Sequence, residues 1–213
     1  MKRNAFVLLV VLWLVAALPA WAGAPAAASQ VVISFRGGST WTGPASGTCV
    51  WYLPIVGDLG LDSLFDGSPY DMDHAHLVWV SPWTIDVLEG SPLFLARANA
   101  GDATIYYRST PGPFDLNNPG VPVAKFDRKT SLLRSDDGGA TDTFIFSAAL
   151  KWSKTFTLGG KRFNFADLMP YGMTCFEYGD QSEGYPSAIE SGTCVAIGGP
   201  GGATAKAGTS GAH

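Results

Sequence analysis

The stretch Phe156-Thr157-Leu158-Gly159-Gly160-Lys161-Arg162-Phe163 places two short runs on either side of a Gly-Gly dipeptide. Two central glycines allow the positive φ angles of a tight two-residue turn, so the stretch predicts a β-hairpin. The same alternation of short apolar runs and turn-forming residues continues in both directions. Residues 93–98 and 103–107 flank the turn-forming residues 99–102, which predicts a second hairpin, and residues 135–139 predict a third turn.

Short runs of strand-forming residues recur along most of the chain, and only residues 165–171 could hold one short turn of helix. We expect strands at residues 31–35, 48–53, 74–80, 84–88, 93–98, 104–108, 121–126, 143–150, 156–158, 162–165, 173–178 and 193–197. About ten to twelve short antiparallel strands with regular turns predict an all-β protein, built as a single-domain β-sandwich (jelly-roll-like) or a barrel.

The N-terminal residues predict export from the cytoplasm. Lys2 and Arg3 precede an apolar run from residue 5 to residue 18, and Pro19 and the small residues around Trp21 follow it. This is the pattern of a secretory signal peptide, residues 1–22, with cleavage after Ala28 as an alternative. The run is shorter than the about 20 residues that a membrane span needs, so we expect none after processing. Residues 29–197 then form the all-β domain, residues 198–213 a flexible Gly- and Ala-rich tail, and the protein is secreted or periplasmic.

The charge of the chain argues against nucleic-acid binding. The full sequence holds 14 basic and 18 acidic residues, and the signal peptide contains two of the basic ones, which leaves 12 − 18 = −6. The remaining Lys and Arg are scattered, whereas phosphate backbones are bound by basic clusters. We therefore expect the partner to be an extracytoplasmic ligand or protein.

Three cysteines in an oxidising compartment predict one disulfide and one free thiol. Cys175 and Cys194 bracket a loop-like segment, and a bond between them would stabilise the fold by about 3 kcal/mol in the chain-entropy model. The alternative is a bond between Cys49 and Cys194. Both lie in copies of Ser-Gly-Thr-Cys-Val, at 46–50 and 191–195, and we interpret each copy as a Ser-Gly turn followed by a strand. The remaining thiol is expected to be a buried, unreactive side chain.

The segment Asp71-Met72-Asp73-His74-Ala75-His76 is the most site-like part of the sequence. On a strand, His74 and His76 would lie side by side and, with Asp73, could bind a divalent metal. A complete site would need a further carboxylate from another element; the candidates are Asp62, Asp66, Asp86 and Glu177. The alternative is that these His and Asp residues bond to one another in a loop, which we favour because two histidines fall short of a ligand set.

Exposed aromatic residues are the remaining candidates for ligand binding. Trp83, Tyr106 and Tyr107 could stack on a flat ligand. Since no complete catalytic set is recognisable, the sequence favours a non-catalytic binding or structural module without a cofactor. The alternatives are a metal-dependent β-barrel enzyme that uses His74 and His76, and a barrel that holds a small apolar molecule.

Overall fold

The structure of the protein is a computed structural model that describes residues 30–43, 45–89, 94–98, 101–135, 141–180 and 187–198. The predicted signal peptide and most of the predicted tail lie outside the described residues. So do residues 99–100 of the second predicted turn and residues 136–139 of the third. The second predicted hairpin itself is wrong, because residues 94–98 pair with residues 85–89 and 131–135 rather than with residues 101–107.

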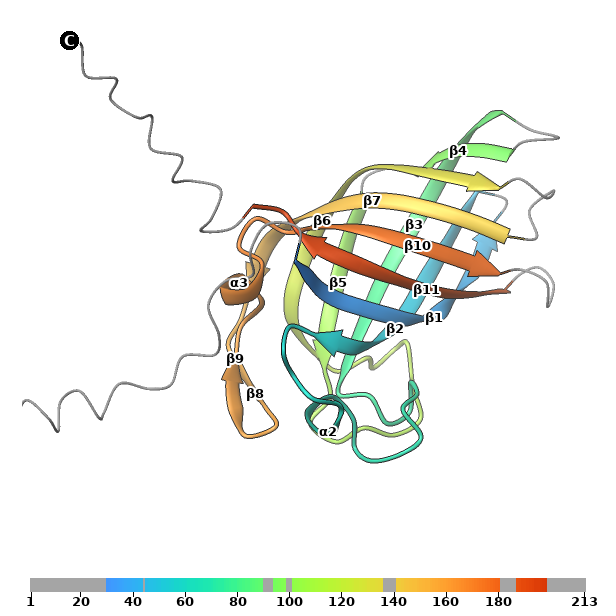
Figure 1. The fold of residues 1–213 in the computed structure, drawn as a ribbon. Coiled ribbons are helices and arrows are strands. Elements are labelled where there is room, and N and C mark those ends of the chain that lie inside the picture. Colours follow the sequence, from blue (N-terminus) through green and yellow to red (C-terminus); the bar gives the residue numbers. More distant parts are fainter. Residues whose placement is uncertain are drawn as a thin grey trace, which may run out of the picture.

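Antiparallel strands follow one another around a closed eight-stranded barrel (Figure 1). Its strands are β1 (Val31–Gly43), β2 (Ser46–Val56), β3 (Leu77–Glu89), β5 (Gly101–Tyr107), β6 (Val121–Ser135), β7 (Thr141–Ser153), β10 (Met173–Asp180) and β11 (Ser187–Ala196). Each pairs with the next, and β11 pairs with β1, which closes the ring. The predicted all-β fold is confirmed, and of the two predicted architectures the protein adopts the barrel. Closure leaves no free sheet edge around the ring.

The strand β3 is one continuous element, although the sequence predicts a break near Pro82. On one side, β3 pairs with β2 through Pro82 itself. On the other, its partner changes from β5, which ends its pairing at Val80, to β4 (Phe94–Ala98), which begins at Ile85. Pro82 therefore lies where no neighbour requires an amide donor on that side, so a proline is tolerated inside the strand.

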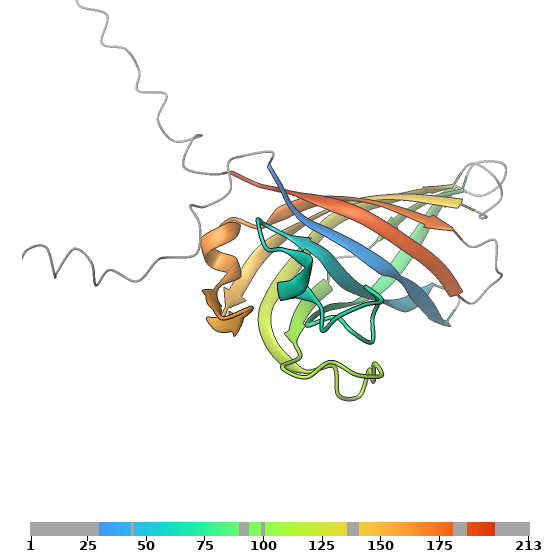
Figure 2. The same ribbon diagram turned by 60° about the horizontal axis from the view of Figure 1, so that its bottom comes forward.

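One end of the barrel, termed here the capped end, is covered by loops and two short helices, α2 (Leu61–Leu64) and α3 (Phe165–Leu168). The strands β8 (Phe156–Leu158) and β9 (Lys161–Phe163) form the predicted hairpin, with φ of 56° at Gly159 and 76° at Gly160, so that prediction is confirmed. Figures 1 and 2 show α2 and the loop between β5 and β6 at this same end. Among the described residues, we find no helix with the length and apolar character to span a membrane.

The barrel interior is layered along its axis. A central aromatic layer is fully buried: Phe35, Trp51, Trp79, Phe126 and Phe146. These rings contact one another, for example Trp51 and Trp79 at 5.1 Å between ring centroids. Burial stabilises by about 1.5–3 kcal/mol for each such side chain. Toward the end opposite the caps, the interior becomes polar, and this change positions the candidate site.

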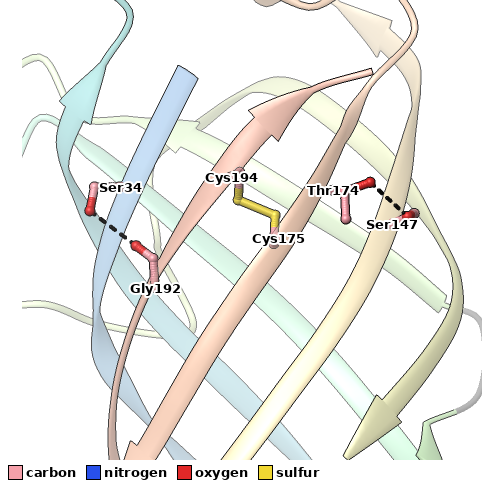
Figure 3. The surroundings of a disulfide bond; sticks show 6 residues. All are labelled: Ser34, Ser147, Thr174, Cys175, Gly192 and Cys194. Carbon is pink, nitrogen blue, oxygen red and sulfur yellow. Dashed lines mark hydrogen bonds between the residues drawn. A yellow bond between two sulfur atoms is a disulfide. The ribbon is translucent and has the colours of Figure 1, made fainter. Parts of the chain in front are cut away.

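A disulfide joins Cys175 of β10 to Cys194 of β11, as one of the two predicted pairings requires (Figure 3). The two residues face each other across the ladder. Hydroxyl groups strengthen the neighbouring strand pairs, because Ser34 Oγ donates to the carbonyl of Gly192 at 3.0 Å and the hydroxyls of Ser147 and Thr174 lie 2.9 Å apart.

Cys49 is the free, buried cysteine, so the alternative bond to Cys194 is not formed. The two Ser-Gly-Thr-Cys-Val copies also differ in position. The first copy opens β2, but its Ser46 and Gly47 are already paired strand residues, and the second copy lies inside β11. The interpretation of each Ser-Gly pair as a turn is therefore wrong. Gly192 instead serves packing, because a Cβ there would lie 2.3 Å from the Phe35 ring.

Candidate ligand-binding cavity

A cavity of about 40 Å³ lies inside the barrel at the end opposite the caps, termed here the cavity end. Its lining comes from the ends of β1, β2, β3, β4, β6, β7, β10 and β11. The lining residues are Ser39, Trp41, Cys49, Trp83, Ile85, Ala98, Leu133, Asp142, Phe144, Glu177, Gly179 and Glu190. A polar cavity needs about 10–15 Å³ to hold one water molecule, so this one accommodates a small polar group.

Two glutamates form the floor of the cavity. Glu177 on β10 and Glu190 on β11 are 7 % and 6 % exposed, which is unusual for carboxylic acids. Trp51 Nε1 donates to Glu190 Oε2 at 2.7 Å, and Ser39 also hydrogen-bonds this side chain. The thiol of Cys49 lies 3.9 Å from Glu190 Oε1 and donates to it. Glu190 is therefore held in a fixed orientation by three donors from β1 and β2.

The two glutamates are hydrogen-bonded to each other, and burial raises the pKa of both. Burial raises the pKa of Glu177 well above its ordinary value, and the charge of Glu190 and a hydrogen bond to it raise that pKa further. Burial also raises the pKa of Glu190, but hydrogen bonds from Ser39, Trp51, Cys49 and Glu177 oppose that effect. Glu177 is thus the protonated partner that donates, and Glu190 is the carboxylate that accepts. Burial likewise raises the pKa of the Cys49 thiol, so it stays protonated.

Arg128 supplies the positive charge next to this pair. Its side chain is fully buried, and Nη2 donates to the carbonyl of Pro82 at 2.9 Å. Burial lowers the pKa of Arg128, whereas its neighbours Cys49 and Glu177 raise it. Its Nε and Nη1, and Oε2 of Glu177, make no hydrogen bond within the described chain. Buried polar groups are nearly always satisfied, so this polar layer has bonding capacity left for a ligand.

Apart from Asp142 and Ser39, the cavity walls above the acidic floor are apolar. The indole rings of Trp41 and Trp83 meet edge to face, with centroids 4.7 Å apart. Trp83, predicted from the sequence as a stacking residue, therefore lies at the cavity. The other two predicted stacking residues do not join it: Tyr106 and Tyr107 end β5 near the caps, where the Tyr107 ring lies 5.1 Å from that of Phe156.

The predicted metal-binding histidines lie at the capped end, in a turn before β3 rather than on a strand. The Nδ1–H of His74 donates to Asp71 Oδ1 at 2.7 Å, and this bond lowers the pKa of Asp71. The Nδ1–H of His76 donates instead to the backbone carbonyl of Arg108, also at 2.7 Å. Asp73 Oδ1 accepts the amide of Phe114 at 3.1 Å.

The structure thus gives His74, His76 and Asp73 separate partners and does not bring them into one ligand set. Over the described ranges of the chain, the one group of three side chains with converging ligand atoms is Cys49, Glu177 and Glu190. The geometry of the turn matches the hydrogen-bonding interpretation of the His–Asp segment, while metal binding there stays a prediction.

Sequence reasoning considered Glu177 only as a distant partner for the histidines and overlooked Glu190 and Arg128. A signal for the two glutamates was present in the alternation of strand residues. Glu177 follows Cys175 by two positions, and Glu190 precedes Cys194 by four. Since side chains alternate between the two faces, a buried disulfide between the cysteines places both glutamates inside as well. No comparable signal identifies Arg128.

Comparison with family models, curated proteins and solved structures finds no match to this chain.

Proposed function

We propose that the protein is an extracytoplasmic, non-catalytic binding module that holds a small, positively charged ligand in the cavity of its barrel. The observation that carries the proposal is the cavity floor, where a buried carboxyl oxygen of Glu177 has no hydrogen-bond partner among the described residues. Small eight-stranded barrels have an interior wide enough to hold one small ligand, and in this one the two buried glutamates of the described chain both line the cavity.

The preferred ligand charge follows from the acidic floor. A cation that approaches Glu177 can take the place of its proton, so both glutamates become carboxylates beside it. In a low-dielectric interior such a contact is much stronger than it would be in water. The Trp41 and Trp83 rings at the wall suit an apolar portion of the ligand, and indole faces also attract cations. An anion would instead meet the charge of Glu190.

The predicted export and the disulfide agree with an extracytoplasmic location, because disulfides persist in oxidising compartments. The Cys49 thiol in the cavity donates to the Glu190 carboxylate, but burial raises the pKa of this thiol and thereby disfavours the nucleophilic thiolate. For this reason we propose binding rather than turnover.

The test compares probes of equal shape and different charge. The purified chain is titrated with n-butylammonium, n-butanol and Zn²⁺ by calorimetry and tryptophan fluorescence, because Trp41 and Trp83 line the cavity. We expect at least one cation to bind in one-to-one stoichiometry and n-butanol to bind at least about tenfold more weakly, a difference of about 1.4 kcal/mol.

The variant Glu177→Gln keeps the side-chain shape but cannot lose a proton to become a carboxylate beside the cation, so cation binding should weaken. Asp71→Asn removes an exposed carboxylate at the capped end and serves as the matched control. Binding of neither cation, or cation binding that Glu177→Gln leaves unchanged, would overturn the proposal.

A further inference from the structure

The three converging groups at the cavity floor include a sulfur atom, and this narrows the ligand class. Cys49 on β2, Glu177 on β10 and Glu190 on β11 each offer a ligand atom, and these atoms all lie within 4.8 Å of one another. All three residues are more than nine-tenths buried, and all three line the cavity. An organic ammonium gains little from a thiol, whereas thiolate sulfur is a strong ligand for soft and borderline metal ions.

Several observations beyond the cluster itself point to a bound group. The unpartnered Oε2 of Glu177 is a buried acceptor on a residue that lines the cavity. The two unpartnered nitrogens of the buried Arg128 are N–H donors, which bind water or an anionic group and do not ligate a metal. The cavity volume of about 40 Å³ has room for an ion and a water molecule at its open coordination position.

For one pair of ligand atoms, Cys49 Sγ and Glu190 Oε1, metal binding requires only a small contraction. Around a tetrahedral Zn²⁺ with bonds of about 2.3 Å to sulfur and about 2.0 Å to oxygen, the two ligand atoms lie about 3.5 Å apart. Cys49 Sγ and Glu190 Oε1 lie 3.9 Å apart. The hydrogen bonds from Trp51 and Ser39 to Glu190 are of the kind that orients metal ligands.

A divalent ion offsets the charge of the ligands and Arg128. When the ion binds, the protons of Cys49 and Glu177 are released to solvent, so the three ligands carry −3 and Arg128 contributes +1, which gives −3 + 1 = −2. One divalent cation neutralises the sum over these four groups, in which Asp142 at the cavity wall is not included.

From these observations we infer that Cys49, Glu177 and Glu190 form a binding site for a thiophilic divalent metal ion of the zinc class. This inference rests on the proposed function, since it names the cation that the cavity holds. Mg²⁺ and Ca²⁺, which prefer all-oxygen sites with six or more ligands, do not compete for it.

The experiment titrates the purified chain, with its disulfide intact, with Cd²⁺ and Zn²⁺. We expect one ion per chain, a sulfur-to-Cd²⁺ charge-transfer band in the ultraviolet, and no displacement by excess Mg²⁺. Cys49→Ser should abolish the band and Glu177→Gln should weaken affinity. Ser39→Ala, which removes a hydrogen bond to a ligand, should weaken affinity about 10-fold.

The matched control is the double variant His74→Ala, His76→Ala, which should bind Cd²⁺ and Zn²⁺ as the unmodified chain does. An ion bound without a sulfur band, or lost in the histidine variant, would contradict the inference. If n-butylammonium binds and neither metal does, the metal inference fails and the proposed function stands. If no cation binds, both fail.

Discussion

At the capped end of the barrel, Asp71 bonds to a histidine three residues away and remains 46 % exposed, whereas at the cavity end Glu177 meets Glu190 inside the barrel. The first pairing lowers the carboxyl pKa, and the second raises it. The difference shows that residue type alone does not indicate a site. Asp71, which has a partner nearby in the sequence, remains solvent-exposed and ionises easily. Glu177 is buried against a second carboxyl group, which favours its protonated form, and one of its oxygens has no hydrogen-bond partner among the described residues.

The two ends also differ in packing. At the capped end, Phe165 of α3 lies against Phe126, Phe156 and Phe163, with ring centroids 5.0–6.5 Å apart. At the cavity end, Phe144 packs on Phe146 at 5.4 Å on one side and faces the cavity on the other. The capped end is therefore the more tightly filled part of the barrel.

The largest expected effect is on the free energy of unfolding, when a phenylalanine is replaced by alanine at each end of the barrel and the two variants are compared. Phe165→Ala removes a fully buried ring and should lower the free energy of unfolding by about 3–5 kcal/mol. Phe144→Ala enlarges a cavity that already exists beside polar groups, so it should cost clearly less. Urea denaturation measures both variants. Equal losses would show that the cavity end is packed as tightly as the capped end.

A smaller effect concerns the pH dependence of stability in the metal-free protein. Around Glu177 lie Glu190, Arg128, Cys49 and Asp142, and the net result is a raised pKa. The folded state keeps a proton that the unfolded chain releases above about pH 4.5. The resulting stabilisation is complete below that pH and is lost as pH rises toward the raised folded pKa.

Glu177→Gln should therefore flatten the fall of stability with rising pH. Denaturation curves are compared between pH 4 and pH 8, which lies below the ordinary Cys49 pKa of 9.0. A steeper fall in the variant than in the unmodified chain would mean that Glu177 is ionised in the folded protein.

The smallest effect is expected at the exposed pair. His74→Ala removes the hydrogen bond that lowers the pKa of Asp71, and pairs so exposed contribute little to stability. The contribution is present above the ordinary Asp71 pKa of 3.8 and is lost as pH falls through the lowered folded value. Thermal melts at pH 7 and in acid should nearly coincide with those of the unmodified chain. A large destabilisation at pH 7 would show that the turn organises the capped end.

The sequence predicted the elements better than the site. Gly159 and Gly160 sufficed for their hairpin, because positive φ at two successive residues is a local property. In contrast, Phe176 and Tyr178 are 51 % and 52 % exposed while Glu177 between them is buried. From hydrophobicity alone, one would expect the opposite orientation of this strand, with the two aromatic side chains in the interior and Glu177 on the surface.

The sequence by itself determined that the chain forms antiparallel strands and left two disulfide pairings open, since alternation and turn residues act between near neighbours. Only the tertiary structure decided between barrel and sandwich, and only it chose Cys175 rather than Cys49 as the partner of Cys194. It also brought Cys49, Glu177, Glu190 and Arg128 into one layer. The physical reason is that closure of the ring determines which strand faces meet across the interior. Alternation within one strand shows which side chains point inward, but it does not show which side chains of distant strands they will contact.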